Sequence, residues 1–518
     1  MRKRYVGKQE DITRTKILLG YDLAFEDLYD LEGLKRIDDL FLKYLGESDE
    51  ELCDQLLVAR AAPDKLERLD ESNLLVAIAP YLEDFLGNLF SIGQSLRALS
   101  ERDNELAPIR ICKRQFIQRR AAKAHSAEDA EGFDGAALEK ALTERFGSAL
   151  DQLTFARHVL EWLDDEEANV VAIDLAERYA AWAGHTKAGR KRHGKNVLFH
   201  LIRKVDHFNL VPTSTEEANG VISMKQPEDK PLYRRDGFSL TDDGMDFIGA
   251  YDHATYCVLC HDRERDSCST GFRDKKTGSF MDNPLGVSLI GCPLDERISE
   301  MHKVKVDGYT LAALAIIAVD NPLVAGTGHR ICNECSKACI FQKQEPVEIP
   351  QVETRIVKDT LALPWGFEIY SLLTRWNPLN FKQPLPLPET GYKVLIVGLG
   401  PAGFTLGHFL MNAGHTVVAV DGLKIEPVDS KISGVTASGE RVVFKPIQDI
   451  AELYENLDER AMAGFGGVAE YGITVRWDKN FLKVLRLLVE RRSLFTMFGG
   501  VRFGSSMTAE SAFSMGFD

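Results

Sequence analysis

The first 210 residues carry a helical pattern of apolar positions. Between about residue 15 and residue 210, apolar side chains recur at spacings of three and four, most clearly in residues 73–86 and 150–163. This is the period of one face of an α-helix. Ser72 stands directly before the first of these runs and predicts a helix start there. We therefore expect residues 1–210 to form an all-α region.

Two stretches interrupt this pattern and predict domain boundaries. Residues 211–245 contain Pro212, Pro227 and Pro231 among glycine and aspartate residues, which favours an irregular connector. Residues 378–391 are proline-rich enough to be extended and stiff, and they lead directly into a predicted strand. The sequence thus predicts a helical region over residues 1–210, a connector over 211–245, a cysteine-rich domain over 246–385 and a last domain over 386–518.

The last domain begins with a strand, a glycine-rich turn and a helix, and a second strand ends at Asp421. The turn residues expected to bind a nucleotide are Gly398, Gly400, Pro401, Ala402, Gly403 and Gly407. In such a turn the first glycine permits the bend, the second lets the backbone approach a pyrophosphate, and the third brings the helix against the strand. Amides at the helix N-terminus would hold the phosphates, and Asp421 would accept hydrogen bonds from ribose hydroxyls. We predict a Rossmann-type unit whose Pro401, Ala402 and Gly407 suit FAD, although chemistry alone does not exclude NAD.

Composition narrows the classes of protein that remain. A chain of 518 residues is long enough for roughly two to four domains. With 44% hydrophobic residues, it has no apolar run near the ~20 residues that span a bilayer. Its basic N-terminus lacks the apolar core of a secretory signal, so we expect a cytoplasmic protein. The net charge of −15 disfavours nucleic acid as a partner, and the basic run at residues 185–195 is expected to be a solvated loop.

Seven of the nine cysteines gather in one part of the chain. They are Cys257, Cys260, Cys268, Cys292, Cys332, Cys335 and Cys339. Because cytoplasmic thiols are kept reduced, this clustering favours metal or cluster binding over disulfides. A two-residue gap lets two thiolates reach one cluster or metal from a single turn, so iron–sulfur clusters are preferred and two structural zinc sites are the alternative. Seven cysteines cannot complete two all-cysteine sites, so one site is incomplete or takes another ligand. Cys53 and Cys112 fall in helical patterns and are expected to be small buried apolar residues.

The order of these motifs is that of a known family. From about residue 250 to 518 the chain resembles the NAD(P)H-dependent glutamate synthase small (β) subunit, and the N-terminal part of dihydropyrimidine dehydrogenase looks similar. The landmarks are the first Cys-x2-Cys, Gly-Cys-Pro-Leu at residues 291–294, Gly-His-Arg-Ile-Cys at residues 328–332, the glycine turn, and Gly-Gly-Val-Ala-Glu-Tyr-Gly-Ile at residues 466–473.

The resemblance implies FAD and two [4Fe–4S] clusters with interleaved ligands. The implied ligands are Cys257, Cys260, Cys268 and Cys339 for one cluster, and Cys292, Cys332, Cys335 and Glu353 for the other. Gly466 and Gly467 are implied to lie near the flavin. The resemblance also implies a helical iron–sulfur domain, a Rossmann-type FAD domain, and electron flow between NAD(P)H, FAD, the clusters and a redox partner protein. No acid–base residue is implied, and His253 and His261 either tune or ligate a cluster or are ordinary loop histidines.

The chain also departs from the family pattern. The seven-residue gap before Cys268 and the loop at residues 273–287 are longer than usual, and residues 426–444 form an insertion that could be a β-hairpin. The family continues past the equivalent of residue 518 into a second dinucleotide domain, so we expect the NAD(P)H-binding domain to lie outside this chain. The alternative interpretation is an accessory protein that uses its helical half to dock a partner.

Overall fold

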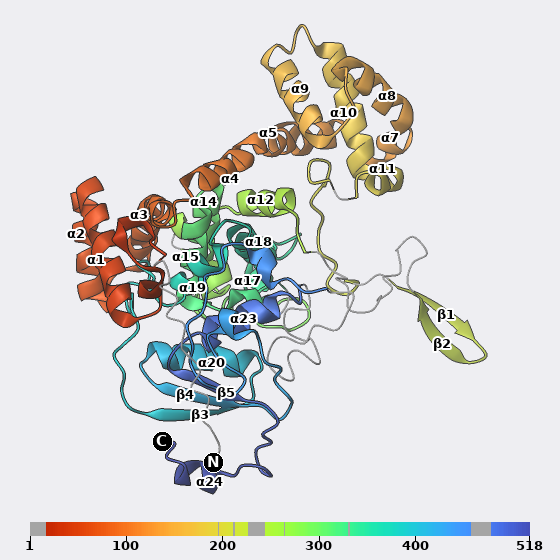
Figure 1. Ribbon diagram of the computed structural model, residues 1–518. Helices are drawn as coiled ribbons and strands as arrows, with labels where there is room; N and C mark the ends of the chain where they lie inside the picture. The colour runs from red at the N-terminus through yellow and green to blue at the C-terminus, as the bar shows by residue number, and fades with distance from the viewer. Residues whose placement is uncertain are drawn as a thin grey trace, which may run out of the picture.

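The computed structural model describes residues 17–194, 196–210, 213–225, 244–263, 265–329, 332–456 and 478–518 (Figure 1). The proposed flavin-proximal residues Gly466 and Gly467 lie outside the described residues. No helix in the described ranges is long and apolar enough to cross a membrane.

The N-terminal region is all-α, as predicted. Its helices up to residue 105 are η1 (Gly20–Asp22), η2 (Phe25–Leu28), α1 (Leu31–Ser48), α2 (Glu50–Ala61), η3 (Pro63–Lys65), α3 (Arg68–Leu89) and α4 (Gly93–Glu105). The helices after residue 105 are α5 (Ala107–Cys112), the π-helix η4 (Lys113–Ala121), α6 (Ala122–Ala124), α7 (Ala127–Glu131), α8 (Gly135–Phe146), α9 (Gln152–Asp164), α10 (Val170–His185) and α11 (Lys187–Arg192).

These helices divide between two hydrophobic cores. Residues of α1–α3 share the largest core with the cysteine-rich part of the chain, and the rings of Phe41 and Phe85 lie 5.9 and 5.8 Å from that of Trp376. The helices from α5 to α10 close around their own core, which includes Phe116, Phe155 and Tyr179. In Figure 1 this second group projects from the rest of the molecule beyond α4 and α5.

The predicted helix start at Ser72 is wrong by about one turn. Helix α3 begins at Arg68 after Glu67, so Ser72 lies inside the first turns and its hydroxyl does not cap the helix. It donates to the backbone oxygen of Arg68 and to the Glu300 carboxylate, so it joins α3 to the cysteine-rich part of the chain.

The expected irregular connector contains a β-hairpin. Strands β1 (Ser214–Ala218) and β2 (Val221–Lys225) pair antiparallel from Ser214↔Lys225 to Ala218↔Val221. Asn219 and Gly220 both have positive φ angles, which a two-residue hairpin turn requires and which Asn-Gly supplies at low cost. The prediction of an irregular connector relied on the prolines and did not use this Asn-Gly signal.

The cysteine-rich part is helical. Its helices are α12 (Phe247–Tyr256), η5 (Cys260–Arg263), α13 (Ser267–Thr270), α14 (Ile298–Val306), α15 (Thr310–Asp320), α16 (Val324–Thr327), α17 (Glu334–Ala338), α18 (Ile349–Leu361) and α19 (Gly366–Leu373). Helix α15 is buried along most of its length and packs against α3, α14 and α18, because a helix that is apolar on all sides can only lie inside a core. The extra loop at residues 273–287 lies on the surface, where two isolated bridges, Arg273↔Phe280 and Asp282↔Ser288, give it local order.

The C-terminal part contains a small parallel sheet. Its elements are β3 (Lys393–Val397), α20 (Pro401–Asn412), β4 (Thr416–Val420), α21 (Ser430–Ser433), η6 (Ile450–Leu453), α23 (Phe481–Glu490), β5 (Phe495–Phe498) and α24 (Ala509–Ser514). The strands are ordered β3-β4-β5, and β3 pairs with β4 from Lys393↔Thr416 to Val397↔Val420. The predicted strand–helix–strand sequence is therefore confirmed.

The insertion at residues 426–444 is not a regular hairpin. It forms the short helix α21 and a single antiparallel bridge, Val435↔Arg441. Its last residue, Phe444, packs edge-on against Tyr29 at 4.9 Å, so this insertion fastens the C-terminal part to the N-terminal helices.

Candidate functional site

Four cysteines from separate stretches of chain line one narrow cavity. They are Cys257, Cys260, Cys268 and Cys339. Cys257 directly follows α12, Cys260 begins η5, Cys268 lies in α13, and Cys339 directly follows α17. Between the first two, Leu259 adopts a left-handed backbone with φ of 52°, which bends the two-residue gap so that both side chains reach the same cavity.

The cavity is apolar, and this sets the chemistry of its thiols. Its other lining residues include Ile298, Ile340 and Val347. Burial raises the pKa of Cys257 to about 12 and that of Cys260 to about 11, and it raises the pKa of Cys268 well above its ordinary value. Thiolates are the form that binds metal, so these groups would ionise here only beside a positive centre such as iron.

His302 is a cavity residue that the sequence reasoning missed. It lies on α14, lines the same cavity, and is fully buried with no hydrogen-bond partner at either ring nitrogen among the described residues. Burial lowers its pKa to about 3, so the ring is neutral and carries one N–H to donate. A buried N–H without an acceptor is costly, and a sulfide or thiolate in the cavity would satisfy it.

The second cysteine group lies beside two buried carboxyl groups. Cys335 in α17 feels the charges of Glu353, Glu296, Cys292 and Cys332, and burial together with these charges raises its pKa well above the ordinary value. Cys335 is buried, Cys292 half-buried and Cys332 exposed. Cys335 is therefore near enough to Cys292, Cys332 and Glu353 for their charges to interact.

Glu296 is the second residue that the sequence reasoning missed. It follows the Cys-Pro segment, is buried, and shares a side-chain hydrogen bond with Glu353. Burial raises the pKa of Glu296 to about 7, and burial together with Glu296 raises the pKa of Glu353 well above its ordinary value. A carboxyl group four residues after a cysteine is too common in protein sequences to be singled out from sequence.

A backbone contact connects the two cysteine groups. The Cys292 amide donates to the Cys268 carbonyl over 2.8 Å. Gly291 makes this approach possible, because a Cβ there would lie 2.4 Å from the Gly271 nitrogen. Across the described ranges, no three His, Cys, Asp or Glu side chains are close enough to hold a single metal ion.

The two histidines considered from sequence are engaged elsewhere. His253 accepts the Glu348 amide at Nδ1, and His261 contacts the Ser299 hydroxyl over 2.6 Å. Neither is among the described residues that line the four-cysteine cavity. Cys53 and Cys112 are buried, as expected.

The glycine turn joins β3 to α20. Gly398 has φ of 95°, and its amide donates to the Val420 carbonyl over 2.7 Å. A Cβ at Gly403 would lie 1.9 Å from the Gly398 oxygen, whereas a Cβ at Gly400 would meet no atom within 4 Å. Gly403 is thus required by helix–strand packing. Gly400 borders open space at the start of α20, which begins with Pro401 and Ala402.

Asp421 lies at the end of β4 beside this turn. Its carboxylate accepts the amides of Leu399 over 3.1 Å and Leu423 over 2.9 Å. These bonds hold the acid against the glycine turn, and each oxygen keeps a lone pair for a further donor. Gly407 faces Ile396 at ordinary contact distance, which allows α20 to pack closely on β3.

The fold and these sites define a mainly helical class of protein, with buried cysteine groups and a glycine turn in a parallel sheet. Residues 19–91 match the family model described as the RP005 N-terminal alpha-helical domain. The chain is 31% identical over 303 residues to the "Uncharacterized protein RP005" of Rickettsia prowazekii (strain Madrid E), covering 55% of this chain and 98% of that protein. The chain therefore belongs to the RP005 family.

Two further relatives are matched over part of their length. The chain is 53% identical over 196 residues to the "Uncharacterized protein RP006" of the same organism, which is 38% of this chain and 26% of that protein. It is 30% identical over 133 residues to the "Glutamate synthase [NADPH] small chain" of Mycobacterium tuberculosis (strain CDC 1551 / Oshkosh), which is 25% of this chain and 24% of that protein. The chain thus spans about a quarter of each of these relatives, and the distant likeness to the second supports an oxidoreductase-like relationship.

Proposed function

We propose that this chain is an electron-transfer subunit of a flavin and iron–sulfur oxidoreductase, similar to the glutamate synthase small subunit. The observation that carries the proposal is the apolar cavity lined by Cys257, Cys260, Cys268 and Cys339, with the unpartnered His302 at its wall. Four thiols in an apolar cavity suit a [4Fe–4S] cluster, in which each thiolate is held by one iron. The neutral His302 would donate its N–H to sulfur and so orient and tune the cluster.

For a second cluster we propose Cys292, Cys332, Cys335 and Glu353 as ligands. Glu353 is nearly fully buried on α18 among these cysteines, which an ordinary surface glutamate is not. Glu296 would hold the Glu353 carboxyl through their shared hydrogen bond, in the way that outer carboxylates orient metal ligands.

For FAD we propose the turn at Gly398, Gly400 and Gly403. The open space at Gly400 would let the backbone approach a pyrophosphate, the N-terminus of α20 would favour its charge, and Asp421 would accept ribose hydroxyls. When bound, a flavin takes two electrons from a hydride and passes them on singly. NAD(P)H and a redox partner protein would complete the path.

Metal and sulfide analysis of the full chain tests the proposal. Protein purified without oxygen should contain roughly eight iron atoms and a similar amount of acid-labile sulfide. Cys268→Ser and Cys335→Ser should each remove about half of the iron, since each breaks one cluster. Cys53→Ser, on α2, is the matched control and should retain all of it. Zinc without acid-labile sulfide would overturn the proposal in favour of structural metal sites.

A second candidate is an accessory protein that docks a partner through its helices. The separate core of residues in α5–α10 favours it, because that unit contributes none of the proposed cofactor ligands. Adding NADPH to oxygen-free protein separates the two. Bleaching of flavin followed by cluster reduction supports the electron-transfer subunit, and a colourless protein supports the accessory role.

A further inference from the structure

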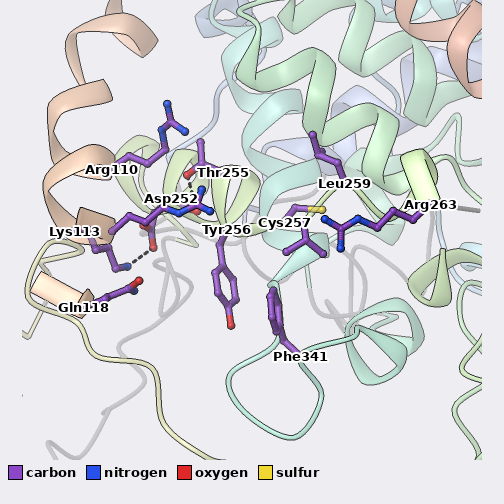
Figure 2. A pocket seen from close by; sticks show the side chains of 12 residues that line it. Arg110, Lys113, Gln118, Asp252, Thr255, Tyr256, Cys257, Leu259, Arg263 and Phe341 are labelled. Atoms are coloured by element: carbon purple, nitrogen blue, oxygen red, sulfur yellow. Dashed lines mark hydrogen bonds and ion pairs between the residues drawn. The ribbon is translucent and has the colours of Figure 1, made fainter. Parts of the chain in front are cut away.

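A cationic hollow lies between the separate helical unit and the first cysteine group (Figure 2). Its volume is about 400 Å³, which falls in the range of small-molecule sites. Arg110, Lys113 and Arg114 line it from α5 and η4, and Arg263 lines it from η5 on the opposite side. Of the cofactor ligands proposed above, Cys257 is the one among the described residues that also lines this hollow.

The charge of the hollow is unbalanced. Its described lining holds four cationic side chains and one carboxylate, Asp252, which leaves an excess of three positive charges. Asp252 is already used, because it forms an ion pair with Lys113 over 2.7 Å. Among the described residues, no carboxylate forms an ion pair with Arg110, Arg114 or Arg263, and the Arg110 Nε is buried without a hydrogen-bond partner.

The wall that carries these arginines has an unusual backbone. Arg110 and Arg114 are four residues apart at the point where α5 passes into the π-helix η4, so both lie on the same side of the helix. π-Helical segments are rare and are frequently found at functional sites. The floor is formed in part by the rings of Tyr256 and Phe341, stacked with centroids 4.4 Å apart.

We propose that this hollow binds a small organic dianion, either a phosphate ester or a dicarboxylate. Planar guanidinium groups match the oxygens of both in paired hydrogen bonds. A small ligand is favoured over an acidic protein because the whole chain carries a net charge of −15. A large acidic partner would be repelled by charges beyond the hollow. A small anion inside it feels mainly the arginines within about 8 Å, the screening length at physiological salt.

The position of the hollow links anion binding to the first cysteine group, which is Cys257, Cys260, Cys268 and Cys339. Cys257 lines both this hollow and the four-cysteine cavity. An anion held here would therefore place negative charge next to the first cysteine group. Binding itself requires neither iron nor flavin, so the two proposals can fail independently.

Calorimetric titration of the full chain with sodium glycerol 3-phosphate, a phosphate monoester, and, separately, with sodium succinate tests the site. We expect one equivalent to bind, with an affinity that falls as sodium chloride is raised. Arg110→Gln with Arg114→Gln should weaken binding at least tenfold, roughly the loss of one charge-assisted hydrogen bond. Binding of glycerol 3-phosphate alone assigns a phosphate ester, and binding of succinate assigns a dicarboxylate.

Two further variants control for folding and for general charge. Arg263→Gln changes an exposed residue on the opposite wall and should weaken binding without altering the thermal unfolding curve. Arg119→Gln removes an exposed arginine from η4 that does not line the hollow and should leave binding unchanged. The proposal is wrong if neither probe binds beyond the heat of matched sodium chloride, or if all variants bind equally.

Discussion

Glu83 shows how burial controls a single ionisable residue. It lies on α3 inside the largest core, and its carboxyl group accepts the Ala312 amide over 2.9 Å. Burial raises its pKa to about 8, although the Ala312 and Leu311 amides and the Lys305 charge oppose this. At neutral pH the folded chain therefore keeps a proton that the unfolded chain has released.

We predict that Glu83 makes the protein less stable as pH rises. The unfolded side chain loses its proton near its ordinary pKa and the folded one near about 8. Between these two pKa values, the contribution of Glu83 to the free energy of unfolding falls by up to ~1.4 kcal/mol per pH unit. Glu83→Gln should flatten this slope in denaturant unfolding between about pH 5.5 and about pH 8.5. Glu101→Gln, an exposed change on α4, should keep it, and an unchanged slope in the Glu83 variant would refute the prediction.

Two substitutions in the glycine turn between β3 and α20 separate an effect on stability from an effect on FAD binding. A methyl group at Gly403 would collide with the Gly398 oxygen, so Gly403→Ala should lower stability by roughly 1–3 kcal/mol. Gly400 has φ of −74° and open space around its Cβ position, so Gly400→Ala should fold normally. If FAD binds here, that methyl group should block the backbone from the pyrophosphate and reduce FAD content at least tenfold. Thermal unfolding and bound flavin absorbance measure both effects, and full FAD retention in Gly400→Ala would move the site elsewhere.

Elements with a strong local signal were predictable from sequence. The helical period of residues 150–163 becomes α9, and the apolar runs on either side of the glycines become β3 and β4. The division of the first 210 residues between two cores was not predictable, because an amphipathic period shows that a face is buried but not against which partner.

The candidate sites show the same limit at the level of side chains. Cysteine spacing singled out the seven thiols, and the family resemblance divided them into two sets. In the structure the four cysteines of one set line one cavity, and charge interactions link Cys335 to the other members of the second set. His302 and Glu296 carry no such pattern. Both residues are buried, and their burial depends on contacts between residues far apart in the chain.

At the scale of the whole molecule, one buried group of polar residues links three parts of the chain. Tyr29 follows η2, Glu368 lies in α19, and Arg491 follows α23. The Tyr29 hydroxyl donates to Glu368 over 2.6 Å, and Arg491 donates to both over 2.9 Å. The side chains of Arg491 and Glu368 are fully buried. The N-terminal helices are therefore built into the part that carries the candidate cofactor sites.

We predict that breaking this group unfolds the large core selectively. Arg491→Met leaves the Glu368 charge buried without its partner and should cost about 3–5 kcal/mol. Arg491→Met combined with Glu368→Met should cost less than the sum of the single changes, because no charge then remains unpaired. Since the helices from α5 to α10 have a separate core, denaturant unfolding should show two transitions, with only one of them shifted. Arg502→Met, an exposed change after β5, should shift neither. Equal shifts of both transitions in Arg491→Met would mean that the two cores unfold as one unit.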